Sequence, residues 1–175
     1  MLRNFRRTRR HPRKLWKGQV AEIQQLERRS LPAGTVLVTF ASNAVTITGD
    51  NKDNGVSVDV AASGVITITG QNDTKISFLG VIHEGDDPIT LPAPTAALGI
   101  SVNLKGGNDD LDVDVGADLG TLPLKNLTVD SGDEEDDIIV VVNAGTTLNF
   151  ADVVSISTGE GRDHLEVNIN GIITI

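Results

Sequence analysis

The sequence predicts an all-β protein, a right-handed parallel β-helix (β-solenoid) with three-sided rungs of ~27 residues. Three observations predict this class. Short runs of Val, Ile, Leu and Thr alternate with polar residues, as in half-buried strands. Gly, Asn, Asp and Pro separate these runs, as in turns. The last part of the chain repeats itself without a gap, with a period of about 27 residues.

The first strands expected along the chain are short alternating runs. They are Val36 to Phe40, Val45 to Thr48, Val56 to Val60 and Val65 to Thr69. A looser period of about 21 residues relates the segment from Ala44 to the segment from Val65, pairing Ile47 with Ile68. We therefore expect two related rungs here. Gly85 to Pro94 predicts an irregular loop, because its three prolines cannot donate ladder hydrogen bonds.

The main repeat occupies three lines of the sequence, residues 98–124, 125–151 and 152–175. Apolar residues recur in the same columns: Ile100, Leu127 and Val154; Val102, Val129 and Ile156; Leu111, Ile138 and Leu165; Val113, Val140 and Val167. Such columns are expected when equivalent strands stack about 4.8 Å apart. A weaker third strand near Leu122 to Leu124 and Thr147 to Phe150 completes each three-sided rung. A β-sandwich is the alternative, although sandwich strands seldom keep a fixed period.

The chain divides into a basic arm, residues 1–33, and a repeat domain, residues 34–175. Residues 1–29 contain ten of the 15 Lys and Arg but only two of the 24 Asp and Glu. The arm is expected to be partly helical, over Val20 to Leu26, or disordered. The chain contains no 18-residue apolar stretch, which predicts no transmembrane segment, and the arm lacks the apolar run of an ordinary secretory signal.

The repeat domain is strongly acidic. Subtracting the arm leaves 22 acidic and five basic residues, a net charge of −17. Such a body repels nucleic acid and favours cations as partners. The absence of Cys excludes disulfides and thiolate metal sites.

The acidic turns of the repeat are candidate calcium sites. Asp109, Asp136 and Asp163 align, and unit charges one rung apart repel by roughly 1 kcal/mol in water and roughly 3 to 4 kcal/mol at an effective dielectric of 20. Calcium, which takes six to eight oxygen ligands, would relieve this repulsion. The candidate ligands are Asn108, Asp109, Asp110, Asp133, Glu134, Asp136, Asp137, Glu160 and Asp163. The alternative is a solvated acidic edge, screened by salt and partly neutralised where His164 aligns with Asp137.

The turn sequences GGNDDL, GDEEDDI and GEGRDHL resemble the Gly- and Asp-rich nonapeptides of calcium-binding RTX proteins, whose pattern is GGxGxDxUx. The resemblance places the pattern's Asp at Asp109, Asp136 and Asp163. It implies calcium held between coils by carboxylates and turn carbonyls. The repeat here is three times as long as a nonapeptide, and Glu134 replaces a glycine of the pattern.

Catalysis is not expected. Some β-helices are polysaccharide enzymes, which is the alternative function, but such an enzyme needs carboxylates or a basic residue converging on a groove. The repeat domain has few basic residues and no Tyr, and the single Trp lies in the arm. We therefore assign no catalytic residues.

The segment AEIQQLERRSLPAG, Ala21 to Gly34, and the basic run before it resemble the N-terminal motif of large planctomycete surface and secreted proteins, roughly LExLExRxLLSA. The resemblance implies an export or sorting role for the arm. It implies a secreted or cell-surface location and a structural or adhesive role for the body. A further alternative is a fragment of a larger surface protein. Calcium, cell-surface polymers and the chain itself, end to end, are the partners we expect.

Overall fold

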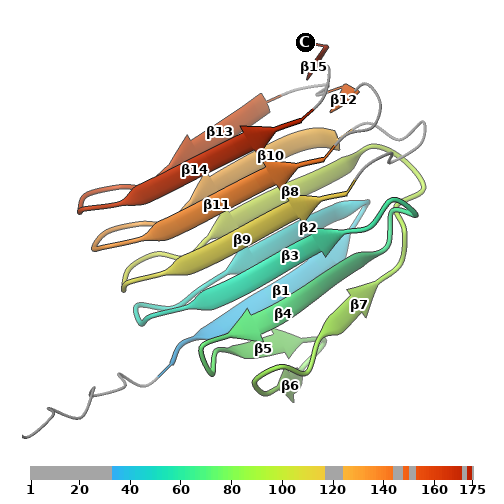
Figure 1. The fold of residues 1–175 in the computed structure, drawn as a ribbon. Helices are drawn as coiled ribbons and strands as arrows, with labels where there is room; N and C mark the ends of the chain where they lie inside the picture. The colour runs from blue at the N-terminus through green and yellow to red at the C-terminus, as the bar shows by residue number, and fades with distance from the viewer. Residues whose placement is uncertain (1–32, 117–123, 144–147, 150–152, 171–172, 175) are drawn as a thin grey trace, which may run out of the picture.

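The computed structural model describes residues 33–116, 124–143, 148–149, 153–170 and 173–174. Within these ranges every regular element is a β-strand, so the predicted all-β class is confirmed. The strands form two large mixed sheets, neither of them closed, and one small sheet (Figure 1). The described residues contain no helix with the length and apolar character needed to cross a membrane.

The two large sheets lie face to face, with one layer behind the other in Figure 1. Sheet A has the order β13 (Val153–Ser157), β10 (Leu124–Asp130), β8 (Leu98–Asn103), β2 (Ala44–Thr48), β1 (Thr35–Ala41), β5 (Lys75–Phe78) and β6 (Val81–His83). Sheet B has the order β14 (His164–Ile169), β11 (Asp137–Val142), β9 (Asp110–Val115), β3 (Gly55–Val60), β4 (Ile66–Gln71) and β7 (Ile89–Leu91). The first four predicted strands correspond to β1, β2, β3 and β4.

The register of the sequence repeat is present in the strand pairing. Leu127 pairs in parallel with Ile100 and with Val154, its equivalents in the preceding and following lines of the repeat. Ile138 pairs in the same way with Leu111 and Leu165. Each rung therefore consists of a strand in sheet A, an acidic turn, and a strand in sheet B. The columns of aligned apolar residues are columns of hydrogen-bonded neighbours.

One core fills the space between the sheets. Alternate residues of each strand point inward, and the inward residues are Val, Ile and Leu in both sheets. In β11, for example, Ile138, Val140 and Val142 are at most 1% exposed. The period of two along each strand therefore places every apolar column on the inner face.

The prediction of two N-terminal rungs related by the shorter period is wrong. Only the first of these segments forms a rung, because β2 and β3 pair in parallel with β8 and β9. Ile47 lies in sheet A, whereas its predicted counterpart Ile68 lies in sheet B. The strand β4 returns antiparallel to β3 after a tight turn at Gly64, whose φ is +80°. A left-handed residue allows this reversal and ends the parallel winding.

The lower end of the stack is formed by β5, β6 and β7 (Figure 1). Gly85 to Pro94 is not wholly irregular, because β7 lies within it and pairs antiparallel with β4. Ile89 and Leu91 are buried against the core, and this burial makes the short strand favourable between two prolines.

The predicted third side lies partly outside the described residues, as do Leu122, Thr147 and Phe150. Within the described part, β12 (Leu148–Asn149) pairs in parallel with β15 (Ile173–Thr174) as a separate small sheet. Residues 1–32, which include the predicted helix from Val20 to Leu26, also lie outside.

Candidate functional site

The acidic turns lie at one edge of the stack, where each rung passes from sheet A to sheet B (Figure 1). The turn between β10 and β11 contains Asp133, Glu134 and Asp136, and the turns before and after it contain Asp109 and Asp163. The nine predicted ligand residues therefore share one edge, but they differ in exposure. Asp109 and Asp136 are only 2% and 3% exposed, whereas Asn108, Asp133, Glu134, Asp137 and Glu160 are exposed.

The aligned aspartates form a hydrogen-bond ladder. The backbone N–H of Asp109 donates to Oδ1 of Asp136 at 2.9 Å. The backbone N–H of Asp136 donates in turn to Oδ1 of Asp163 at 3.2 Å. Each carboxylate thus binds the backbone of the equivalent residue in the preceding rung. A carboxylate that accepts backbone N–H groups fixes the register of one turn on the next.

The ladder begins at Asn54, which sequence analysis missed. Its backbone N–H and its Nδ2 donate to Oδ1 of Asp109 at 2.7 and 3.1 Å. Nδ2 also donates to the carbonyl of Lys52 at 2.6 Å. The signal was available, since VSVDV from Val56 aligns with LDVDV from Leu111 at roughly twice the spacing of the repeat. We call Asn54, Asp109, Asp136 and Asp163 the Asx ladder.

The second carboxylate oxygens of the ladder are in an unusual environment. Oδ2 of Asp109 and Oδ2 of Asp136 are buried and have no hydrogen-bond partner among the described residues. Burial raises the pKa of Asp109 to about 7, against the lowering effect of the Asn54 hydrogen bonds. Burial also raises the pKa of Asp136, against the lowering effect of hydrogen bonds with the Ser131 side chain and the Asp109 backbone. The charges of Asp163 and Asp133 raise it further. The ionised ladder is therefore costly, and a proton or a cation would relieve it.

The other predicted ligands make separate contacts on the outside of the turns. Oδ1 of Asn108 accepts the backbone N–H of Glu135 at 3.1 Å, and Oδ2 of Asp110 accepts from Nδ2 of Asn72 at 3.2 Å. Nδ1 of His164 lies 2.8 Å from Oδ1 of Asp137, as their alignment predicted. A hydrogen bond from this imidazole to Asp137 raises the pKa of His164.

The described residues contain no group of three or more His, Cys, Asp and Glu side chains arranged to hold a metal ion. The structure therefore brings Asp109 and Asp136 together in a buried column but does not gather the nine candidates around one point. Their role as calcium ligands remains a prediction.

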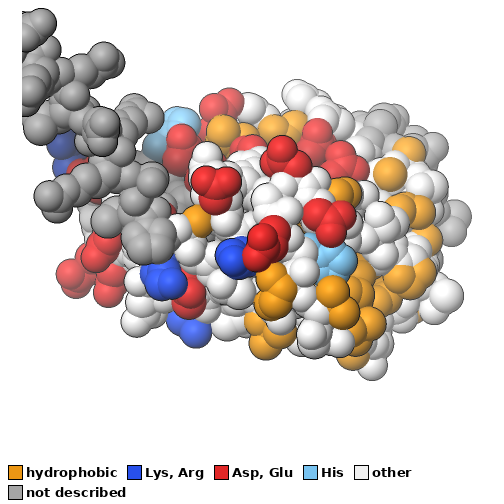
Figure 2. All heavy atoms as spheres, turned by 90° about the horizontal axis from the view of Figure 1, so that it is seen from below, with side chains coloured by type: hydrophobic (Ala, Val, Ile, Leu, Met, Phe, Trp, Pro, Cys, Tyr) orange, Lys and Arg blue, Asp and Glu red, His pale blue; other side chains and the backbone are white. Residues whose placement is uncertain are grey.

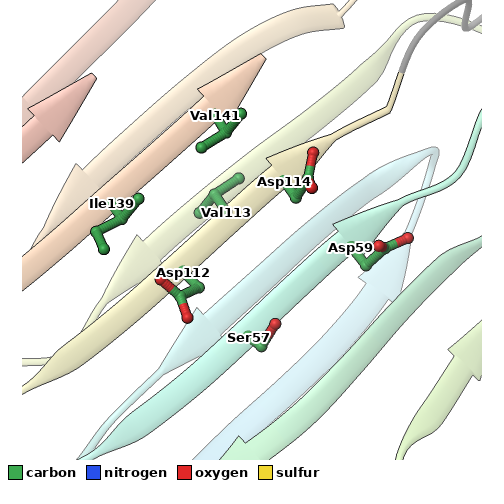
Figure 3. Close-up of a pocket in the computed structure, with 7 residues that line it drawn as sticks. All are labelled: Ser57, Asp59, Asp112, Val113, Asp114, Ile139 and Val141. Carbon is green, nitrogen blue, oxygen red and sulfur yellow. The ribbon is translucent and has the colours of Figure 1, made fainter. Parts of the chain in front are cut away.

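A shallow depression of about 270 Å³ lies on the outer face of sheet B (Figure 3). Its lining residues are Ser57, Asp59, Asp112, Val113, Asp114, Ile139 and Val141. Two of its carboxylates have amide partners, because Gln71 donates to Asp112 and Asn143 donates to Asp114. Its titratable lining residues are the carboxylates Asp59, Asp112 and Asp114.

Comparison with protein-family models, with curated proteins and with solved structures found no match.

Proposed function

We propose that this chain is a non-enzymatic structural or adhesive module of the cell exterior, built as a right-handed parallel β-helix. The Asx ladder is the observation that carries the proposal. Within the described residues it runs through all four rungs that pair in parallel and holds successive turns in one register. A repeated, locked rung makes a stiff rod, which is the property required of a structural element.

The path of the chain supports the right-handed helix. Each strand of sheet A reaches its parallel neighbour only after a strand in sheet B, as in β8, β9 and β10. Such crossover connections between parallel strands are right-handed in about 98% of cases. The resemblance of Ala21 to Gly34 to a planctomycete surface-protein motif supports the external location.

The ladder can be tested by separating its hydrogen bond from its charge. Asp136→Asn keeps an oxygen that accepts the N–H of Asp109, whereas Asp136→Ala leaves that buried N–H without a partner. We expect the Ala variant to be less stable than the Asn variant by about 2 kcal/mol in urea unfolding. Equal stability of the two variants would show that the ladder does not hold the rungs together.

Calcium is the second part of the proposal, and the buried Oδ2 of Asp109, which has no hydrogen-bond partner among the described residues, favours it. Carboxylate oxygens are ligands that calcium prefers, and a bound ion stabilises the folded state by mass action. We expect calcium, but not magnesium, to raise the melting temperature of the natural chain and to have little effect on Asp136→Asn. A melting temperature that does not change with calcium would contradict calcium binding but not the hydrogen-bond ladder.

Location and activity need separate measurements. A reporter fused after the repeat domain and produced in a planctomycete host should be found outside the cytoplasm. A screen against acidic and neutral polysaccharides should detect binding without cleavage. Reproducible cleavage that is lost in Asp112→Asn, a residue of the acidic depression on sheet B, would favour the enzyme alternative.

A further inference from the structure

The two ends of the stack differ in how their edge strands are finished. At the upper end in Figure 1, β13 and β14 are the outermost strands of sheets A and B among the described residues. They are five and six residues long and regular. Regular edge strands present unpaired N–H and C=O groups and are ready templates for another strand.

The inner face of β14 is also uncovered. Leu165, Val167 and Ile169 are 45%, 43% and 39% exposed. Their counterparts one rung below, in β11, are at most 1% exposed. Val154 of β13 is 48% exposed in the same way, whereas Leu127, its partner in β10, is buried. Among the described residues, the upper end therefore displays one layer of core residues with no second layer of sheets A and B above it.

The lower end is protected against strand addition. Its edge strands, β6 and β7, have only three residues each, and Pro88 and Pro92 flank β7. Short edges and prolines oppose further pairing. Figure 2 shows this end from below, with acidic side chains among the apolar ones. An upper end would therefore find no matching edge at the lower end of another copy.

We propose that the upper end docks a second copy of this chain, upper end to upper end, in a two-fold dimer. In this dimer β14 pairs antiparallel with β14 of the second copy, and β13 pairs with its own counterpart. Symmetric closed dimers use the same patch on both subunits. The contact extends the rung-on-rung packing that already covers β11, with the partner providing the missing apolar layer.

The sequence of β14 is self-complementary in an antiparallel register centred on Val167. Leu165 then faces Ile169 across the two strands, and Val167 faces its own equivalent, so that apolar residues meet on the inner side. On the outer side Glu166 faces Asn168, to which it is already hydrogen-bonded within one strand at 2.5 Å. Like charges directly opposite each other would destabilise the pairing, and this register places none opposite each other.

The test is sedimentation equilibrium of the full chain over a series of concentrations. We expect a reversible dimer of the 18.5 kDa chain. Asn168→Glu places a new carboxylate opposite Glu166 of the second copy, twice per dimer, and should weaken dimerisation on the order of tenfold. Adding Glu166→Lys to Asn168→Glu makes both pairs attractive and should restore it. All these side chains are exposed, so the fold should be unaffected.

Val167→Lys is the stronger variant, because two lysines would meet at the symmetry axis, and it should give a monomer. Its control is Ile82→Lys in β6, an apolar residue of the lower end that is 50% exposed. The control should leave the dimer intact. A monomer at every concentration would overturn the proposal. So would a dimer that survives Val167→Lys, or one that Ile82→Lys disrupts.

Discussion

The upper and lower parts of the stack are built from the same alternating Val, Ile and Thr runs, yet they are connected differently. In the upper part every strand of sheet A continues into sheet B, and its partner is the equivalent strand of the next rung. In the lower part β1 and β2, β3 and β4, and β5 and β6 form antiparallel hairpins between sequence neighbours, although β1 also pairs in parallel with β5. The strands are alike in composition, so the turns must decide the difference.

The turns differ in their backbone conformation. The β1–β2 hairpin has two consecutive left-handed residues, Ser42 and Asn43, with φ of +51° and +60°. Such a pair is the signature of a tight two-residue hairpin. Two of the acidic turns instead place left-handed residues two positions apart, Lys105 with Gly107 and Gly132 with Glu134. The turn between β4 and β5 also passes between the sheets, but it has the consecutive left-handed pair Asn72 and Asp73. The acidic turns thus differ from the β1–β2 hairpin in backbone conformation, although one pattern of left-handed residues does not account for every crossing.

The largest expected effect comes from a side chain added at a turn glycine. A Cβ at Gly132, where φ is +101°, would overlap the carbonyl oxygen of Lys105 in the rung below. Gly132→Ala should therefore lower the free energy of unfolding by about 4 kcal/mol. Gly80, in the β5–β6 hairpin, also has a positive φ, but a Cβ there would meet open space.

Gly80→Ala is the matched control and should cost only the left-handed strain, about 1 kcal/mol. Urea unfolding of both variants measures the difference. If the two substitutions cost the same, close stacking of the acidic turns is not what distinguishes the upper part from the hairpins.

A smaller effect on stability should follow from a change of pH, and its largest source, Asp109, lies in the upper part. Asp109 has a folded-state pKa of about 7, above the ordinary value of 3.8, because it is buried. Between these values the folded chain binds more protons than the unfolded chain, so stability falls as pH rises toward 7 and then levels off. A shift of this size corresponds to about 4 kcal/mol, of which about 3 kcal/mol should be lost between pH 5 and pH 8. The raised pKa values of Asp136 and Asp110 act in the same direction.

Urea midpoints at pH 5 and pH 8 measure this loss, and the midpoint should be higher at pH 5. Asp109→Asn keeps an acceptor for Asn54 but cannot ionise, so the pH dependence should become distinctly shallower. A midpoint that rises from pH 5 to pH 8 would mean that the ladder is not the buried, proton-binding column described above. The exposed pair of His164 and Asp137 also loses strength as pH rises. His164→Gln therefore serves as the control, because it removes the contribution of this pair to the pH dependence.

The strand pairing of the upper part could be predicted from sequence, whereas in the lower part only the strands could be. The period of the main repeat places Asp109, Asp136 and Asp163 in one column. Equivalent strands pair in parallel with the same period, so the aligned positions of the sequence are neighbours in the structure. The shorter period, which pairs Ile47 with Ile68, compares strands that alternate alike but lie in different sheets. Side-chain alternation is the same for parallel and antiparallel strands, so it carries no information on direction.

The candidate site was predicted in position but not in chemistry. Aligned carboxylates suggest a cation, because repulsion between them must be relieved. The structure shows that one oxygen of each inner carboxylate accepts a backbone N–H, which no charge count reveals. Asn54 escaped notice because its rung lies at roughly twice the repeat spacing from the next. Asn54 ends the ladder as a donor, because its backbone N–H and its Nδ2 both donate to Asp109 while its own Oδ1 accepts no hydrogen bond.

The smallest effect should appear where a turn position is occupied by a residue unsuited to it. Glu134 has a φ of +94° and aligns with Gly107 and Gly161 of the neighbouring rungs. Glu134→Gly should stabilise the chain by about 1 kcal/mol, since the left-handed strain is removed. Glu134→Gln keeps the strain and removes the charge, so it should have little effect.

Leu79→Gly, at a hairpin residue with a φ of +50° that is 85% exposed, should be stabilising as well. Gains at both sites would mean that backbone strain is local to each turn. A gain from the Gln variant as large as that from the Gly variant would instead assign the cost at Glu134 to repulsion among the acidic turns.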